Sequence, residues 1–468
     1  MQVRVRIGPS PTGVPHIGVT RTALFNFLFA KKFGGKFIVR IEDTDRERLI
    51  PSSIPKILEI LKFLGLRWDG KVYFQSQRLA IYQEHAKKLV DSGDAYFCFC
   101  TPQRLEKLRT ELSQKGLPPK YDRHCLTLTK KEINQKIVGK EKHVIRMKIP
   151  VGETSWNDLI HGAISFKNEL LDDQILVKSD SFPTYHLAVV VDDRLAKITH
   201  VLRGDEWISS TPKHLTLYKA FGWKPPEFGH LPLVLGPDKT KLSKRHGARS
   251  VLEYRDDGYL PEALNNFMAL LGWSPPASAE ASAGKKTQEI FSLGELVEMF
   301  ELKGINPTSP IFNLEKLNWF NKQWIMKLDD TELVKRLGNF IPKNWDKNLV
   351  KKVLPLVKER ITTLADFVNW TNFFFEEVKP DFKGVKKDLV KSILENIDKS
   401  FTKVSSWHLS EIEKSARNAI DGIKPKDAFH ILRMAVTGKS VGPPLFESLE
   451  ILGKSKVLER IKNAKKRL

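Results

Sequence analysis

Residues 6–18, RIGPSPTGVPHIG, form a loop that separates a predicted strand from a predicted helix. The run VRVRI (residues 3–7) alternates with period two, as in a half-buried strand, and residues 19–33 have a helical pattern that ends at Gly34-Gly35. A helix that starts directly after such a loop presents unpaired N–H groups to which a phosphate can bind. The stretch therefore predicts the first βα unit of an α/β fold, with a phosphate site at its turn.

Three features of the loop fit a phosphate site. Pro9 and the neighbouring prolines stiffen it, while Gly13 and Gly18 permit tight turns and close approach of a ligand to the backbone. His16 stands at the helix start, where it can donate a hydrogen bond to a phosphoryl oxygen. The competing interpretation is a structural turn with an incidental histidine, and the loop alone does not separate the two.

The strand and helix signals continue beyond the loop. KFIVRI (residues 36–41) predicts a second strand, and apolar residues at helical spacing over residues 54–64 predict a helix. This alternation of predicted strands and helices indicates a parallel sheet with helices packed on it. We expect residues 186–193 (HLAVVVDD) and 196–204 (AKITHVLRG) to form two buried strands, whereas beyond about residue 310 the patterns are helical.

The amino-acid composition limits which classes of protein and which partners are possible. The 468 residues carry a net charge of +22, and hydrophobic residues make up 41% of them, which excludes a largely disordered chain. No apolar run approaches the length that spans a bilayer, no signal peptide is evident, and three cysteines suit a reducing compartment, so we expect a cytoplasmic protein. The positive charge favours a polyanionic partner such as nucleic acid.

A second loop, residues 239–250 (KTKLSKRHGARS), is strongly basic and contains Lys241, Ser243 and Lys244. Such a loop suits phosphate neutralisation, although most charged runs are simply solvated. No P-loop and no G-x-G-x-x-G pattern occurs in the chain.

Taken together, PHIG (residues 15–18) and KLSKR (residues 241–245) resemble the two signatures of class I aminoacyl-tRNA synthetases. Flanking motifs narrow the resemblance to the bacterial-type glutamyl-tRNA synthetase family and occur in its order and spacing: RIGPSPTG, FIVRIEDTD, PTYHLA-x-VVDD, HVLRGDEW, KLSKRHGA and VGPPLFESLE. The resemblance covers essentially the whole chain.

The resemblance implies a reaction and a set of residues. Glutamate would attack the α-phosphate of ATP and then be transferred to the 3′-terminal ribose of tRNA. Residues expected to bind glutamate are Arg6, Ser10, Glu42, Tyr185 and Arg203. Residues expected to bind ATP, with Mg²⁺, are Pro9, Gly13, His16, Gly18, Lys241, Ser243 and Lys244. Of these, His16, Lys241 and Lys244 are the expected catalytic residues. The competing interpretation of Glu42 is a local ion pair with Arg40 or Arg46.

Four further positions are expected to contact tRNA. Asp45 and Arg48 match positions near the acceptor end, and Arg360 and Arg433 are candidates for reading anticodon bases. The aromatic run over residues 367–378 could suggest base stacking, but its helical spacing favours a hydrophobic core. Val189 stands where some family members have a polar residue that helps to hold the amino acid.

The three cysteines form the pattern Cys98-x-Cys100, followed by Cys125. This arrangement resembles the zinc site of some family members, in which a histidine two residues after the last cysteine completes the ligands. Here Thr127 occupies that position, so Tyr121 and His124 are the substitute candidates. Cysteines that pack as small hydrophobic residues are the competing interpretation.

We therefore expect an α/β Rossmann-like catalytic domain, interrupted by an inserted α+β acceptor-binding domain and followed by an all-α anticodon-binding region. The expected catalytic halves are residues 1–94 and 187–235, the insertion is 95–186, a basic-loop and stem-contact domain is 236–325, and the helical domain is 326–468. The basic surplus fits this plan, because residues 101–150 carry 13 basic and 5 acidic side chains.

The expected function is that of a monomeric glutamate–tRNA ligase for tRNA-Glu, and a non-discriminating form would also charge tRNA-Gln. A small-molecule nucleotidyltransferase, or a paralogue that glutamylates a tRNA base, would lack the helical C-terminal third. Glutaminyl-tRNA synthetase would have β-barrels there. A non-catalytic RNA-binding relative is disfavoured because His16, Glu42, Lys241 and Lys244 are present.

Overall fold

The computed structural model describes residues 2–242, 249–276, 289–420 and 422–468. These divide into two compact units, one made of residues 1–253 and 264–314 and the other of residues 254–263 and 315–468. The first unit mixes strands and helices and the second is helical, so the expected fold class is confirmed. Residues 274–287 (SPPASAEASAGKKT), which are rich in Ser, Ala, Pro and Gly and therefore predict a surface loop, lie mostly outside the described residues.

Parallel strands form the centre of the first unit. The strands β1 (Arg4–Ile7), β2 (Lys36–Ile41) and β3 (Tyr73–Phe74) pair in that order, and β9 (His200–Gly204) pairs with β10 (Glu227–Leu231). Thr199 N donates a hydrogen bond to Arg4 O at 2.9 Å, which brings the start of β9 beside β1. The carboxyl ends of all these strands therefore point toward one edge, where α/β proteins bind their ligands.

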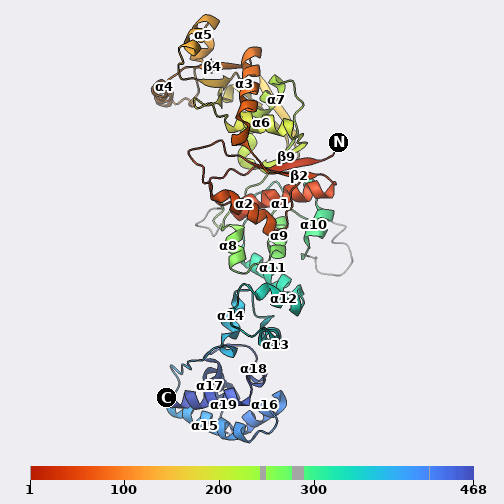
Figure 1. The fold of residues 1–468 in the computed structure, drawn as a ribbon, viewed down its shortest axis with the longest axis vertical. Helices are drawn as coiled ribbons and strands as arrows, with labels where there is room; N and C mark the ends of the chain where they lie inside the picture. Colours follow the sequence, from red (N-terminus) through yellow and green to blue (C-terminus); the bar gives the residue numbers. More distant parts are fainter. Residues whose placement is uncertain (1, 243–248, 277–288, 421) are drawn as a thin grey trace. The chain divides into compact units, whose positions relative to one another are not determined.

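Helices cover these strands because their apolar faces need burial. Helix α1 (Ile17–Lys32) lies along β1 and β2 (Figure 1) and buries Phe25 and Leu28 completely. Outside residues 95–177, the other α-helices that the structure describes wholly within this unit are α2 (Ser53–Phe63), α3 (Leu79–Ser92), α6 (Tyr185–Leu195), α7 (Thr211–Ala220) and α10 (Leu293–Met299). Helices α8 (Val251–Asp256) and α9 (Pro261–Leu270) begin in one unit and end in the other.

Residues 95–177 supply a separate set of strands. An antiparallel sheet has the order β4 (Ala95–Cys98), β5 (Val144–Met147), β8 (Ile175–Val177), and a hairpin joins β6 (Glu153–Asp158) to β7 (Gly162–Lys167). Helices α4 (Pro102–Gln114) and α5 (Lys130–Val138) start at Thr101 and Thr129, whose hydroxyl groups cap them.

One predicted strand is wrong. The run HLAVVVDD lies in helix α6 (Tyr185–Leu195), whereas the next predicted strand is present as β9. Residues 187–193 are all buried, so this part of α6 is surrounded by protein on every side, although the helix ends in the exposed Arg194 and Leu195. A helix buried all round shows a continuous apolar run, and such a run cannot be distinguished from a buried strand by periodicity.

The second unit is built from helices α11 to α19. Their bounds are α11 (Leu314–Lys327), α12 (Asp330–Leu337), α13 (Lys347–Val357), α14 (Asp366–Thr371), α15 (Lys387–Lys403), α16 (Leu409–Asn418), α17 (Pro425–Thr437), α18 (Leu445–Leu452) and α19 (Lys454–Lys466). Figure 1 shows α15 to α19 gathered together, and buried apolar side chains from all five helices form one cluster. Phe367, Phe373 and Phe374 are each at most 1% exposed, which confirms the core interpretation of the aromatic run.

Candidate active site

A cavity of about 500 Å³ opens at the carboxyl ends of β1, β9 and β10. Its walls come from the loop after β1, the start of α1, Glu42 after β2, Tyr185 at the start of α6, and the basic loop at Lys241. All the described residues predicted to bind glutamate or ATP line it, namely Arg6, Pro9, Ser10, Gly13, His16, Gly18, Glu42, Tyr185, Arg203 and Lys241. Segments nearly 240 residues apart in sequence thus meet in one place.

His16 is the N-cap of helix α1. Its Nδ1 accepts a hydrogen bond from Gly18 N at 3.1 Å, so a neutral ring carries its proton on Nε2. Burial, and then the charge on Lys241, lower the pKa of His16, which favours this neutral form. His16 is therefore a hydrogen-bond donor at a positive helix terminus, as an anionic ligand requires.

Glycines make room for this arrangement. A Cβ at Gly18 would lie 3.0 Å from His16 Cε1, and a Cβ at Gly8 would overlap Glu42 Oε1. Gly13 has φ = +150°, a backbone conformation that other residues rarely adopt. These positions keep the loop close to the cavity.

The basic loop joins the first loop through the backbone. Ile17 N donates to Arg249 O at 3.2 Å, and His16 and Ser250 form an isolated antiparallel bridge. Lys241 lines the cavity, whereas the predicted Ser243 and Lys244 lie outside the described residues. The two sequence signatures are thus parts of one site.

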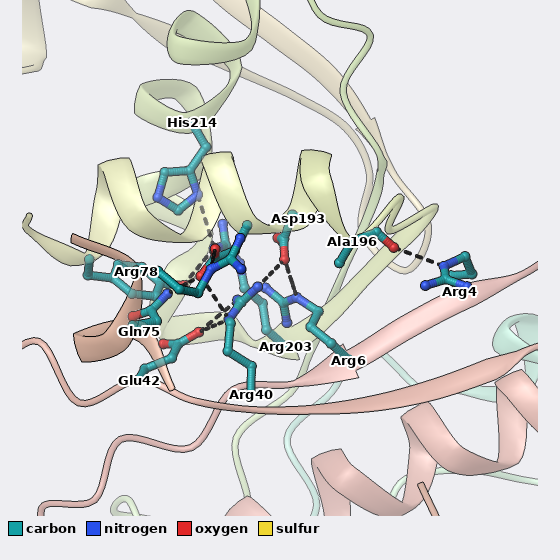
Figure 2. Close-up of polar contacts among 12 residues, drawn as sticks. Arg4, Arg6, Arg40, Glu42, Gln75, Arg78, Asp193, Ala196, Arg203 and His214 are labelled. Atoms are coloured by element: carbon teal, nitrogen blue, oxygen red, sulfur yellow. Dashed lines mark hydrogen bonds and ion pairs between the residues drawn. The ribbon is translucent and has the colours of Figure 1, made fainter. Parts of the chain in front are cut away.

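A network of buried charges contacts Arg6 and Glu42 of the cavity wall (Figure 2). Asp193 accepts hydrogen bonds from Arg6 Nε at 3.2 Å and from Arg40 Nη1 at 2.7 Å. Arg40 Nη2 also donates to Glu42 Oε1 at 2.8 Å, so the local ion pair considered for Glu42 does form. Burial raises the pKa of Glu42 and Arg40 opposes this rise, so a nearby ammonium group would further favour the ionised carboxylate.

Arg203 differs from the other arginines of this cluster because no described carboxylate pairs with it. Its side chain is buried, with Arg203 only 5% exposed, and its Nη1 donates to Tyr185 Oη at 3.2 Å. Burial lowers the pKa of Arg203, although a guanidinium group stays charged at physiological pH. Arg203 therefore offers an unneutralised positive charge beside Tyr185.

The charges of the cluster do not balance. It contains four guanidinium groups and three carboxylates, and the members are Arg6, Arg40, Arg78, Arg203, Glu42, Asp192 and Asp193. Among the described residues Arg203 has no carboxylate in direct contact, and a buried charge is costly unless a partner neutralises it. A ligand with one net negative charge would supply that partner.

The sequence did not reveal every residue of this site. Arg21, Glu206 and Trp207 also line the cavity, and Asp193 and Arg40 bind two of its lining residues, Arg6 and Glu42. Asp193 lies in the quoted VVDD motif, but a carboxylate on a buried helix gives no signal of its partners. Val189 is 1% exposed within an apolar cluster and is not among the cavity residues.

The four predicted tRNA-contact residues lie on two separate parts of the chain. Asp45 and Arg48 form an exposed ion pair, with Arg48 Nη2 2.6 Å from Asp45 Oδ2. In the helical unit, burial and the charge on Arg360 lower the pKa of Arg433, so these two cations are close enough to repel. Arg433 Nη1 also donates to Pro443 O at 2.5 Å.

The three cysteines converge between β4 and the short helix at His124–Thr127. Their Sγ atoms lie within 4.8 Å of one another, and Tyr121 Oη is 3.4 Å from Cys98 Sγ and 3.3 Å from Cys100 Sγ. His124 is exposed and does not join this group. Three sulfurs and one oxygen at these distances could hold a tetrahedral zinc ion.

Comparison with known proteins identifies the class. Residues 2–319 match the family model "tRNA synthetases class I (E and Q), catalytic domain", and residues 332–465 match the model "Anticodon binding domain". The chain thus has the catalytic and anticodon-binding domains of a class I tRNA synthetase.

The relatives identify the family. Glutamate–tRNA ligases from Borreliella burgdorferi and Dehalococcoides mccartyi are each 43% identical to the chain, over 99% and 100% of its length and 98% of theirs. A solved glutamate tRNA ligase from Elizabethkingia meningosepticum, in complex with its amino acid, is 32% identical, with a TM-score of 0.89 and full coverage of both chains. The chain belongs to the glutamate–tRNA ligase family, which confirms the resemblance in its sequence. Its described helices include none that is both long and apolar enough to cross a membrane.

The charged wall predicts an effect on stability. Asp193→Asn keeps the side-chain volume but leaves Arg6 and Arg40 without their shared carboxylate, which should lower the free energy of unfolding by about 3–5 kcal/mol. Urea unfolding measures this loss. Arg6 and Arg40 lower the pKa of Asp193 against the effect of burial, so the stabilisation is present above the ordinary carboxyl pKa and is lost as pH falls through the lower folded value.

Asp91→Asn is the matched control, because Asp91 pairs with Lys87 at 2.8 Å on the exposed surface. Exposed pairs contribute about 0–1 kcal/mol. Equal losses in the two variants would contradict a stabilising role for the buried cluster.

Proposed function

We propose that the chain catalyses ATP-dependent attachment of glutamate to tRNA-Glu, with release of AMP and pyrophosphate. The observation that carries this proposal is the single cavity that contains a phosphate-binding helix start, a basic loop and an unbalanced guanidinium cluster. Family membership supports the same reaction, because class I synthetases use ATP. We further propose that the protein acts as a cytoplasmic monomer with Mg²⁺ bound to ATP, and that the five sequence ranges given above are its domains.

ATP would bind at the start of helix α1. Gly13 and Gly18 let the phosphates approach the backbone, and His16 Nε2 donates a hydrogen bond to the α-phosphate as charge develops there. Lys241, together with Lys244 and Ser243, would neutralise the phosphate oxygens. These residues form no covalent bond with the substrate, so positioning and electrostatics carry the catalysis.

Glutamate would bind against the buried charges. Arg6 and Arg203 would hold its carboxylates, Glu42 its ammonium group, and Ser10 and Tyr185 would add neutral hydrogen bonds. Glutamate carries one net negative charge, whereas glutamine carries none. The surplus positive charge of the cluster therefore favours glutamate, and Val189 adds no polar contact to that selection.

Transfer RNA would contact both units. Asp45 and Arg48 would lie near its acceptor end, the basic residues 101–150 near its acceptor stem, and Arg360 and Arg433 near its anticodon. The relatives named above are glutamate–tRNA ligases, so the comparisons do not favour the non-discriminating form that would also charge tRNA-Gln.

We also propose one structural zinc ion held by Cys98, Cys100, Tyr121 and Cys125. The hydrogen bond from Cys125 lowers the pKa of Cys98 to about 4 against the effect of burial, and Arg104 Nη1 lies 3.4 Å from Cys100 Sγ. These surroundings favour a thiolate at Cys98, whereas the hydrogen bond with Cys98 and burial raise the pKa of Cys125, and burial raises the pKa of Tyr121, so zinc binding there would release their protons. When bound, zinc would supply a cross-link between β4 and the segment that contains Tyr121 and Cys125.

The first experiment tests the reaction itself. Purified protein should attach glutamate to a tRNA-Glu transcript in the presence of ATP and magnesium, and it should not attach glutamine, because the latter lacks the negative charge that the cluster needs. Filter-bound radiolabelled amino acid measures the product, and a tRNA-Gln transcript tests discrimination in the same assay. Absence of glutamylation of both tRNAs would refute the proposed function.

A second prediction concerns His16. The variant His16→Ala should lower the rate of glutamyl-adenylate formation by about 10²-fold or more, because it removes a donor aimed at the developing charge. Pyrophosphate exchange with tRNA present measures this rate. Binding of tRNA, measured by filter retention, should remain nearly unchanged, and equal exchange rates in variant and wild type would overturn the assignment.

A third prediction concerns the metal. Protein purified without chelator should contain about one zinc per chain, as measured by atomic emission spectrometry. Tyr121→Phe should lower that content, because phenylalanine offers no ligand, whereas Thr127→Ala should not. Less than half an equivalent in the wild type would exclude the site.

A further inference from the structure

Arg203 is held by neutral groups alone. A guanidinium has five N–H bonds, and all five of Arg203 point at acceptors that carry no negative charge. The acceptors are His230 Nε2 at 3.1 Å, Tyr185 Oη at 3.2 Å, His214 Nδ1 at 3.2 Å, Trp207 O at 3.2 Å and Thr211 Oγ1 at 2.7 Å. The group is therefore fixed in orientation while its charge remains available.

This arrangement dictates the proton positions on two histidines. Because arginine only donates, His230 Nε2 and His214 Nδ1 must both carry lone pairs. His230 must then carry its proton on Nδ1 and His214 on Nε2. The proton on His214 Nε2 has an acceptor in His186, whose Nδ1 lies 3.0 Å away.

The proton on His230 Nδ1 has an acceptor in Asp158, the last residue of β6. Its Oδ2 lies 2.5 Å from His230 Nδ1, and both side chains are fully buried. Its Oδ1 accepts three backbone N–H groups, from Ile160 at 3.1 Å, His161 at 3.2 Å and His230 at 3.1 Å. Burial alone would raise the pKa of Asp158, but these hydrogen bonds lower it to about 2, so the carboxylate only accepts.

We propose that Asp158 is a positioning residue for glutamate recognition, which fixes the Nδ1–H tautomer of His230 and thereby aims Arg203 at a carboxylate of the substrate. A carboxylate in place of His230 would also hold Arg203, but it would cancel the charge that the substrate must meet. The neutral imidazole separates these two effects, because it transmits the orientation set by Asp158 without neutralising Arg203.

The inference rests on the proposed role of Arg203 and extends it to the hairpin of β6 and β7. That hairpin belongs to the range expected to form the inserted acceptor-binding domain. A residue outside the expected catalytic halves would thus orient a residue of the amino-acid pocket. Asp158 does not line the cavity and would never touch glutamate.

The variant Asp158→Asn tests this role with almost no change in volume. The three backbone N–H groups keep the amide oxygen at the Oδ1 position, so the amide NH₂ faces His230 Nδ1. The imidazole proton must then move to Nε2, where it opposes the N–H of Arg203. We expect the KM for glutamate in aminoacylation to rise about 10- to 100-fold, which corresponds to a lost charged hydrogen bond. The KM for ATP should stay within about 2-fold and kcat at saturating glutamate within about 3-fold.

The tautomer provides a readout independent of activity. Nitrogen-15 spectra of histidine-labelled protein should show His230 protonated on Nδ1 in the wild type and on Nε2 in Asp158→Asn. The signals are assigned by their loss in His230→Ala. That variant also removes the acceptor of Arg203 Nε directly and should raise the KM for glutamate by itself, so it tests the inference if Asp158→Asn folds poorly.

Asp173→Asn is the matched control. Asp173 is 1% exposed and accepts hydrogen bonds from Tyr96 Oη and Ile149 N, but it does not contact Arg203. The variant Asp173→Asn should therefore leave the KM for glutamate unchanged. An unchanged KM in Asp158→Asn and His230→Ala, or an equal rise in the KM values for glutamate and ATP, would overturn the inference.

Arg203→Ala separates this inference from the proposed function. If Arg203→Ala leaves the KM for glutamate unchanged, the proposed role of Arg203 is wrong. If it raises that KM while Asp158→Asn does not, only the positioning role of Asp158 is wrong.

Discussion

The central constraint on this protein is the cost of burying guanidinium groups at the end of a parallel sheet. Arg6 and Arg40 share Asp193, and Arg40 also holds Glu42, so these charges remain buried only because each has a partner on a neighbouring element. The pairing of β1 with β2, helix α6 and the glycine at residue 8 all serve this network, because each allows one charged group to approach another. The same network leaves one positive charge for a substrate.

The two loops depend on this framework in different ways. The loop after β1 begins beside Arg6 and ends at His16, so the amino-acid end and the phosphate end of the cavity are joined by only nine residues between them. The basic loop reaches the same place from the other side through the contact of Ile17 with Arg249. An amino acid and a nucleotide bound here would therefore be oriented by one rigid turn, which is how a reaction without covalent catalysis gains its rate.

Much of this could be predicted from the sequence, and the exceptions have physical causes. Strand β1, helix α1 and strand β2 show clear periodicity, and His16, Glu42 and Arg203 belong to recognisable motifs. The sequence predicts a strand where helix α6 lies, because seven consecutive residues of that helix, 187–193, are buried and leave no helical periodicity. The pair of Asp158 and His230 was missed because the two residues are 72 positions apart and neither stands in a motif, so only the fold brings them together. Sequence patterns thus report local conformation and signature residues, whereas the partners that orient those residues depend on tertiary structure.

The path of the chain between its two compact units has a consequence for how such proteins can be divided. Residues 254–263 belong to the helical unit, although residues on both sides of them belong to the first. Within that segment Glu262 pairs with Arg336 at 2.9 Å, and Leu260 N donates to Asn321 Oδ1 at 2.8 Å. The backbone therefore passes from one unit to the other three times, at 253/254, 263/264 and 314/315. A single cut cannot release either unit with all its residues, so loss or exchange of the helical unit during evolution would require repair of this short segment as well.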